Sequence, residues 1–388
     1  MAEQREGMTV NRLPSLTWNR LGVNFAKIFD DEIPASDAEA AFSARNDDQV
    51  ARGARATEEA QTFADSMSDG VRREAYVAAK RSIYQGQHFA TGLGHDFTDY
   101  MNANVPETYV YTVEENDHPD KPIVLNWDFG KGAKALAQQV IHVKKNAEAT
   151  FLMTYTSEKN AEGLGMFETR VILEEGATLH LMKVNLLGEG FVLADDSAAV
   201  VRDGAHFDYL SVMLGAARTY AGCYADQCGK GAMFTVDTGY MAEKDHLVDI
   251  NYVAAQRGKK TQSKINVKGS LRDTAKKVFR GTIDFRKGTK GSTGDEQEDV
   301  LLLSPRVTNK TVPVILTEEE DVDGRHGATI GNLSEDILFY LETRGLDADA
   351  AEMLMTRGRL AGVAHRIPDQ DTVDRIDAFI EEAFGNND

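Results

Sequence analysis

The sequence contains only two cysteines, Cys223 and Cys228, among its 388 residues. A disulfide framework needs more thiols than this, and so does a metal site held by four cysteines of one chain. The two residues lie in a segment rich in Gly and Ala with C-x-x-x-x-C spacing, which matches no complete site. The two cysteines are therefore either structural residues or thiolate ligands that contribute to a shared site, and the sequence leaves both alternatives open.

Long apolar runs are also absent. No run approaches the roughly 18 residues that a membrane span needs, and the charged N-terminus, Met1 to Val10, has no apolar core behind it that would make a secretory signal. Acidic residues outnumber basic ones by 62 to 43, for a net charge of −19. Such a surface repels phosphate backbones and anionic lipids. We therefore expect a cytoplasmic protein that binds neither nucleic acid nor membrane.

The usual signatures of an autonomous enzyme do not occur in the sequence. There is no G-x-x-x-x-G-K-[ST] phosphate loop, because the stretch GKKT from Gly258 to Thr261 lacks the upstream glycine. There is no H-E-x-x-H zinc helix and no G-x-S-x-G nucleophile elbow. We expect no catalysis from this chain, because the sequence gives no positive support for a hydrolase or a kinase.

A repeat is present instead. Four short alternating runs begin with a turn residue followed by alanine, and these alanines, Ala147, Ala177, Ala205 and Ala232, are 30, 28 and 27 residues apart. A small-residue corner followed by a strand of period two is typical of stacked β coils, in which each coil buries its inner face against its neighbours. The pattern predicts a mainly β protein with a parallel β-helix (solenoid) over residues 121–330.

A mixed region that includes helices is predicted before this core, over residues 1–120, and a helical domain is predicted after it, over residues 331–388. The stretch from Asp37 to Tyr84 is rich in Ala, Glu, Arg and Gln, which favours helices, with breaks near Gly53 and Ser68 to Gly70. The next stretch, Gln85 to Asp120, is rich in turn formers and predicts loops with short strands.

Three helices are expected after Gly331. Ser334 and Asp347 are predicted N-caps, Gly345 is a left-handed stop, and a last helix begins at Asp371 or Thr372. The last helix has one apolar face that packs either on the solenoid of this chain or on a partner protein. The residues of that face are Val373, Ile376, Ile380 and Ala383.

The stretch from Leu301 to Gly345 carries an ordered series of motifs. In sequence order these are LLLSP (Leu301 to Pro305), Pro313, the acidic turn Glu318 to Asp323, HGAT (His326 to Thr329) and LFYLETRG (Leu338 to Gly345). The series resembles the C-terminal core of the SufB/SufD family, the non-ATPase scaffold subunits of the SUF iron–sulfur cluster assembly machinery. The resemblance implies a right-handed parallel β-helix and a scaffold role in a cytoplasmic complex.

The resemblance also indicates candidate cluster ligands. His326 matches a histidine implicated in cluster assembly at the interface of paired scaffolds, and an imidazole with carboxylates nearby is a good iron ligand. Glu298 stands where SufB-type members have a cysteine, and Gly324 stands where SufD-type members commonly have one. Cys223 and Cys228 are the other candidates. The chain looks closer to SufD than to SufB, so we expect a transient cluster at most and none held stably by this chain alone.

Partners follow from the same resemblance. The C-terminal helices are expected to dock a SufC-type ABC ATPase, and the β-helix is expected to pair with a SufB-type subunit or with a second copy of the chain. Three alternatives remain open: a SufB-like homodimeric scaffold that assembles the cluster itself, a β-helix carbohydrate-active enzyme, and a solenoid that binds a protein without metal. The candidate docking residues are Ser334, Ile337, Leu338, Phe339, Tyr340, Leu341, Arg344 and Gly345.

Overall fold

The structure, a computed structural model, describes residues 7–29, 38–46, 51–52, 91–105 and 108–385. Most of the stretch for which helices were predicted, Asp37 to Tyr84, lies outside the described residues, as do both predicted helix breaks. Two described pieces of that stretch are strands rather than helices, namely β3 (Ala41–Arg45) and β4 (Ala51–Arg52). Helix propensity is overridden there because both strands pair with the first strands of the core.

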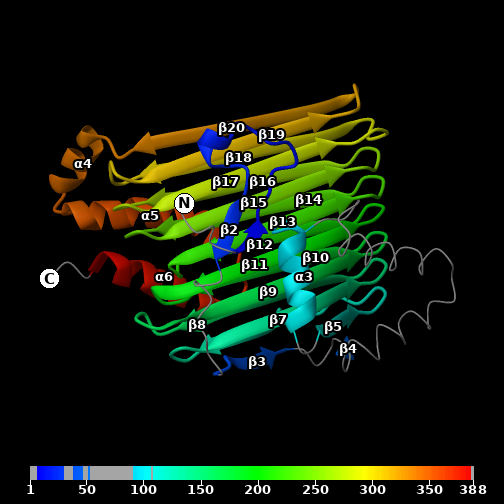
Figure 1. Cartoon of the computed structure of the whole chain (residues 1–388), viewed down its shortest axis with the longest axis horizontal. Helices are drawn as coiled ribbons and strands as arrows, with labels where there is room; N and C mark the ends of the chain where they lie inside the picture. The colour runs from blue at the N-terminus through cyan, green and yellow to red at the C-terminus, as the bar shows by residue number, and fades with distance from the viewer. Residues whose placement is uncertain (1–6, 30–37, 47–50, 53–90, 106–107, 386–388) are drawn as a thin grey trace, which may run out of the picture.

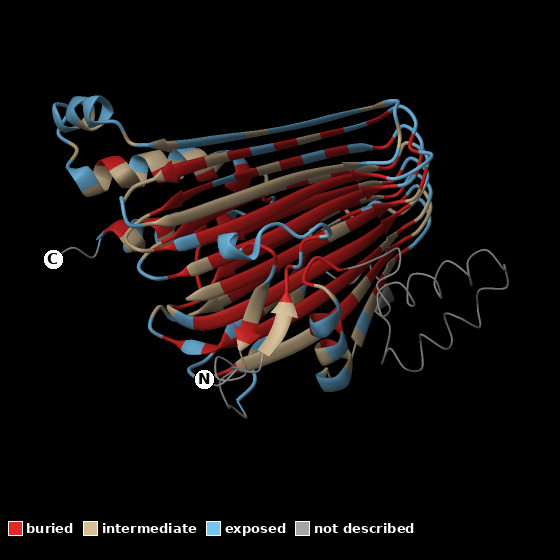
Figure 2. Cartoon of the chain, turned by 45° about the horizontal axis from the view of Figure 1, so that its top comes forward, coloured by how far each residue is buried: buried red, intermediate tan, exposed pale blue. Residues whose placement is uncertain are grey.

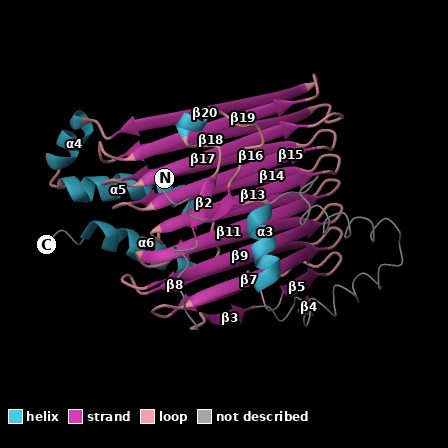
Figure 3. Ribbon diagram, in the orientation of Figure 1, coloured by secondary structure: helices cyan, strands magenta, loops and turns pink. Residues whose placement is uncertain are grey.

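The core is a parallel β-solenoid, which confirms the predicted β-helix (Figures 1 and 3). From β5 onward, consecutive strands alternate between two nine-stranded sheets, so each coil contributes one strand to each sheet. Sheet I contains β3, β6 (Ile123–Phe129), β8 (Glu148–Ser157), β10 (Thr178–Leu186), β12 (His206–Met213), β14 (Met233–Ala242), β16 (Gln262–Leu271), β18 (Ser292–Leu302) and β20 (Val322–Asn332). Sheet II contains β4, β5 (Thr108–Val113), β7 (Lys134–Val143), β9 (Glu162–Leu173), β11 (Gly190–Val201), β13 (Arg218–Gln227), β15 (Leu247–Gln256), β17 (Lys276–Phe285) and β19 (Thr308–Thr317).

The repeat alanines stack at one corner of the solenoid. Each is buried, and each follows a residue with positive φ, a conformation that suits Gly and Asn. Those preceding residues are Asn146, Gly176, Gly204 and Gly231. The sequence repeat therefore corresponds to the same corner in successive coils of the solenoid.

The two ends of the solenoid differ. At the first coil, β3 and β4 add antiparallel to β6 and β5 and cover the edges. At the last coil, the residues of β19 are only partly buried and most residues of β20 are exposed, as the pale strand along the upper edge of Figure 2 shows. We call this the open end. Within the described residues, β19 and β20 each have one neighbouring strand, β17 and β18.

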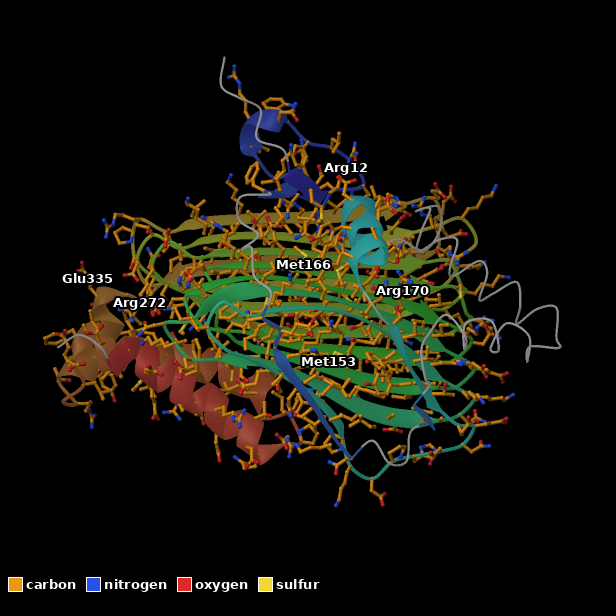
Figure 4. All side chains as sticks on the ribbon, turned by 60° about the horizontal axis from the view of Figure 1, so that its bottom comes forward. Arg12, Met153, Met166, Arg170, Arg272 and Glu335 are labelled. Atoms are coloured by element: carbon orange, nitrogen blue, oxygen red, sulfur yellow. The ribbon has the colours of Figure 1, made fainter. Side chains whose placement is uncertain are left out.

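The N-terminal segment lies across the outer face of sheet II, on the side opposite the C-terminal helices (Figure 4). It contributes β1 (Gly7–Val10), the short helix η1 (Asn19–Leu21), β2 (Ala26–Phe29) and α3 (His95–Asn104). The prediction of loops and short strands for residues 85–120 was wrong for α3, although β5 lies in that stretch. The backbone N–H groups of Gly92 and Leu93 donate to the buried carboxylate of Asp196 at 2.9 and 3.0 Å, so a contact distant in sequence fixes the start of this helix.

The C-terminal helices are α4 (Glu335–Glu342), α5 (Ala348–Ala364) and α6 (Gln370–Gly385). Ser334 and Asp347 cap the first two as predicted, accepting hydrogen bonds from backbone N–H groups at 3.2 and 2.8 Å. Gly345 has a φ of 90°, as expected for the stop. None of the helices in the described ranges is both long and apolar enough to cross a bilayer.

Helices α5 and α6 pack on the outer face of sheet I, so the apolar face of the last helix packs on the solenoid of this chain, the first of the two alternatives. Leu360 and Val363 of α5 lie on Gly239 of β14, where an added Cβ would come within 2.9 Å of the Leu360 side chain. Val373, Ile376 and Ile380 of α6 are buried in the same cluster. These two helices are therefore bound firmly to the middle coils.

A charged cluster fixes the segment between α5 and α6. The guanidinium of Arg366 pairs with Asp208 at 2.6 Å and also with Asp237 on the next coil. Asp208 also bonds to Nδ1 of His180 at 2.6 Å, and Nε2 of His180 lies 3.3 Å from Glu148. The hydrogen bond to Asp208 raises the pKa of His180 above its usual value.

His180 should make the stability of the chain depend on pH. Because its pKa is raised in the folded state, its contribution is full below the usual value of about 6.5 and is lost as the pH rises through the raised pKa. We expect His180→Gln to lower the free energy of unfolding more at about pH 5.5 than at about pH 9. Denaturant unfolding at both pH values measures this difference.

His206 on the neighbouring strand provides the matched control. Burial lowers its pKa, so His206→Gln should show the opposite trend, with the smaller loss of stability at acid pH. Equal losses for His180→Gln at the two pH values would contradict the role given to the Asp208 contact.

Candidate functional site at the open end of the solenoid

His326 lies on β20, the last strand of sheet I, and is exposed. Its direction follows from Gly324 two residues earlier, where an added Cβ would meet the side chains of Phe285 and Ile315 at 2.9 and 3.3 Å. Those two side chains come from the opposite sheet, so Gly324 faces the interior. Residues two apart on a strand share a face, and His326 therefore faces the interior too.

The residue beneath His326 in register is Glu296 of β18. Beneath Glu296 the same column continues through apolar or aromatic residues, one in each coil. These are Ile265, Val236, Tyr209 and Leu181. Within this column, a carboxyl and an imidazole group therefore occur only in the last two coils.

Glu296 is a buried carboxyl group, with 2% of its surface exposed. Its Oε2 atom has no hydrogen-bond partner among the described residues. Gly281 on the facing strand provides the space for the carboxyl group, since an added Cβ there would lie 2.4 Å from its atoms. Burial raises the pKa of Glu296 to about 8, and the nearby charge of Glu298 adds to the effect.

Glu298, by contrast, has its partners. Its carboxylate forms a buried ion pair with Lys277, and its Oε2 accepts a hydrogen bond from Thr311 at 2.5 Å. The ammonium group of Lys277 also donates to Thr311 at 3.1 Å. Glu298 lies two residues after Glu296 on β18, so it is close to the column that contains His326. The charge of its carboxylate is already balanced by Lys277.

The two cysteines lie away from the open end, and each packs against a different group of residues. Cys223 points into the core of β13, and burial raises the pKa of its thiol well above the usual value. Cys228 packs against Ala198 and Val200, and burial raises the pKa of its thiol to about 11. Three strand spacings separate β13 from β19, which is about 14 Å along the solenoid. The structure therefore does not bring either thiol to His326.

The acidic residues before His326 are engaged elsewhere. Asp323 pairs with Arg325 at 2.6 Å, and Asp321 lies 3.7 Å from Lys290. No group of three or more His, Cys, Asp or Glu side chains in the described ranges is arranged to hold a metal ion. A metal at the open end would need donors beyond those that this chain provides in one place.

Glu296, Lys277 and Gly281 were missed at the sequence level. The run STGDEQEDVLL of β18 is polar on both faces, so its alternation does not show which residues face inward. Gly294 shows which alternate residues of β18 face inward, because it faces Ile283 across the interior. Counting in twos from Gly294 would then have selected Glu296 and Glu298.

The predicted docking residues lie on or beside α4, which buries none of its residues. Ile337, Phe339 and Tyr340 are 44%, 67% and 56% exposed. Leu338 and Leu341 are half-buried, Ser334 caps the helix, and Gly345 ends it. The Arg344 guanidinium lies 5.2 Å from the centre of the Tyr340 ring.

Comparison with known proteins now decides the family. The family model described as "SUF system FeS cluster assembly, SufBD core domain" matches residues 129–359, well over half of the chain. The chain belongs to the SufBD family. The matched range contains most of the solenoid, the open end with His326, all of α4 and most of α5, so the candidate site lies within the SufBD core.

Curated relatives agree with the family model. An iron–sulfur cluster assembly protein SufD of Bacillus subtilis is 29% identical over 124 residues, which cover 32% of this chain and 28% of the relative. A SufBD family protein of Staphylococcus aureus is 24% identical over 262 residues, or 59% of this chain and 56% of the relative. One from Mycobacterium tuberculosis is 34% identical over 108 residues, or 28% of this chain and 13% of the relative. The chain thus matches between about an eighth and just over half of the length of these relatives.

The ion pair beneath the open end should be essential for stability. Replacing Lys277 by Met leaves Glu298 buried without its counter-ion, which should lower the free energy of unfolding by about 3 to 5 kcal/mol. Lys276→Met at the exposed neighbouring position is the control and should change little. Denaturant unfolding measures both variants. A further change, Glu298→Gln in the Lys277→Met background, should restore part of the loss, and no restoration would argue against a specific pair.

Proposed function

We propose that this chain is a SufD-like, non-ATPase scaffold subunit of the SUF iron–sulfur cluster assembly machinery. It docks a SufC-type ABC ATPase through its C-terminal helices and pairs through its open end with a SufB-type subunit or a second copy. Membership of the SufBD family supports this reading over a carbohydrate-active enzyme. The iron–sulfur cluster is the cargo of the complex, and the chain holds it only transiently.

The observation that carries the proposal is the exposed apolar face of α4. A helix of eight residues that buries none of them gains little from the rest of this chain. Ile337, Phe339 and Tyr340 are exposed apolar side chains there, and Leu354 of α5 is also exposed. Several large apolar side chains exposed on one short helix are typical of a protein-binding site. An ATPase subunit seated on α4 would bury it.

The open end supports the second contact. β19 and β20 are 10 and 11 residues long, and each presents an edge of backbone N–H and C=O groups without a neighbour among the described strands. Long edges of this kind are usually covered or paired, because they otherwise aggregate. A second scaffold that adds to both edges would extend the two sheets and enclose His326 between the subunits. The missing thiols near His326 favour a partner that contributes them over a homodimer that works alone.

The docking contact can be tested by pull-down. We expect a Phe339→Asp, Tyr340→Asp double variant to lose the SufC-type ATPase of the same genome after co-expression, because two charges would be placed in the apolar contact. The measurement is the ratio of ATPase to tagged chain after purification, and we expect it to fall at least tenfold. Point variants are preferable to removal of all C-terminal helices, because α5 and α6 cover apolar side chains of sheet I.

Trp18→Ser is the control for exposed aromatic side chains. Trp18 is 83% exposed on the N-terminal segment, away from α4, and its replacement should leave copurification unchanged. Full retention of the ATPase by the folded double variant would overturn the docking proposal.

A further inference from the structure

We propose that residues 13–24 form a clasp loop, a rigid loop outside the solenoid that holds a second copy of this chain on the open end. The inference rests on the proposed function, in which the open end pairs with another scaffold. It concerns how the pair is held together and assigns no cluster ligand.

The clasp loop is closed and held from within. The N–H group of Leu13 donates to the C=O group of Asn24 at 2.8 Å, so the two ends meet, as in a compact Ω-loop. The buried side chain of Asn24 bonds to the backbone and the hydroxyl group of Thr17 and to the side chain of Asn19, at 2.7 to 3.0 Å. The conformation of the loop is therefore fixed before any partner binds, which lowers the entropy cost of binding.

Large apolar side chains on and next to this loop are exposed. They are Leu16, Trp18, Leu21 and Phe25, with exposed fractions of 56%, 83%, 53% and 45%. Figure 4 shows the loop standing out from the outer face of sheet II. Several large apolar side chains exposed on one rigid loop, with a tryptophan among them, are typical of a protein-binding site.

The clasp loop is anchored at the open end. Its buried residues Leu13 and Val23 pack against valines of β17 and β19. Lys310, near the start of β19, donates from its ammonium group to the C=O group of Leu21 at 2.8 Å. The other edge of β19 has no neighbour among the described strands. A chain that adds a strand there would lie one strand spacing, about 4.8 Å, from the strand that carries the loop.

The charges at the two ends of β19 are complementary. Residues 7–29 contain Arg12, Arg20 and Lys27 but no Asp or Glu, although the chain as a whole has a net charge of −19. Arg20 is exposed in η1, at the tip of the loop that lies near the start of β19. The acidic turn Glu318 to Asp323 directly follows the end of the same strand.

The acidic turn is only partly neutralised within the chain. Glu318 lies 3.8 Å from Arg286, and Asp321 lies 3.7 Å from Lys290. The next acidic residue of the turn, Glu320, is exposed. The open end therefore presents an excess of negative charge at this corner, which a cationic loop would complement.

A two-fold axis normal to the sheets brings the loop and the turn together. Such an axis pairs β19 with β19 and β20 with β20 in antiparallel fashion, and it keeps sheet II of both copies on the same side. The start of β19 in one copy then lies beside the end of β19 in the other, so Arg20 of each copy approaches the acidic turn of the other. Within one copy, roughly 26 Å of extended strand separates Lys310 from Glu318. The loop and the turn are therefore complementary between copies and not within one.

The test is the dimer dissociation constant of the full-length chain, measured by analytical ultracentrifugation. We expect the wild type to dimerise and the double variant Leu16→Ser, Trp18→Ser to raise the Kd about tenfold or more, because apolar contacts are lost. Arg20→Glu and Glu320→Lys should each weaken the dimer. Their combination in one chain should restore part of the affinity, because opposite charges again face each other across the interface. Lys131→Glu, the same change of charge at an exposed position of the first coil, is the control and should dimerise as the wild type does.

Each outcome decides the inference. A weaker dimer in the folded apolar double variant, together with restoration by the charge swap, supports the clasp loop. A monomeric wild type, an unchanged Kd in the double variant, or no restoration by the swap overturns it. Pairing with a SufB-type scaffold but not with a second copy also overturns it. Copurification of the ATPase reports separately on the proposed function, because α4 is unchanged in all of these variants.

Discussion

A coil of a solenoid can bury its inner face only against the coils beside it, and the whole structure depends on this constraint. In the middle of the chain the constraint is met by apolar columns in register, such as Leu181, Tyr209 and Val236. The first coil is covered by the antiparallel strands β3 and β4. The last coil has no such cover among the described residues, and in the last two coils the same column contains Glu296 and His326. In this column, therefore, a carboxyl and an imidazole group appear only near the open end, although other positions of the middle coils hold buried ion pairs such as Lys183–Asp195.

Features that depend on local signals could be predicted from the sequence. The corner alanines, the caps Ser334 and Asp347, and the stop at Gly345 each act within a few residues, so the pattern of the chain contains them. The helix α3 could not be predicted in this way, because only Phe97, Thr98 and Met101 are buried in it and its start is fixed by Asp196, about a hundred residues away. Long-range contacts decide the structure of that segment, and no local pattern records them.

The candidate site shows the same division. His326 could be found because its motif is contiguous, whereas Glu296 could not, since β18 is polar on both faces and only the paired strands reveal its inner one. The cysteines were left undecided by their spacing, and the structure separates them because residues five apart on and after a strand point to opposite sides. Cys223 enters the core and Cys228 packs outside it. In each case the residue type indicated the chemistry. Whether the side chain points into or out of the solenoid depends on its position in the alternation of the strand.

The proposed connection between α4 and the site depends on which C-terminal elements are packed against the solenoid and which are not. Helices α5 and α6 are fixed to the middle coils by apolar packing and by Arg366, so they resist displacement. Helix α4 has no buried residue, and only two residues separate Asn332, at the end of β20, from Glu335 at its start. β20 in turn has one neighbouring strand among those described, β18. In the proposed complex, a pull on α4 would therefore act first on the least supported strand of the solenoid, the one that carries His326, before it could disturb the anchored helices.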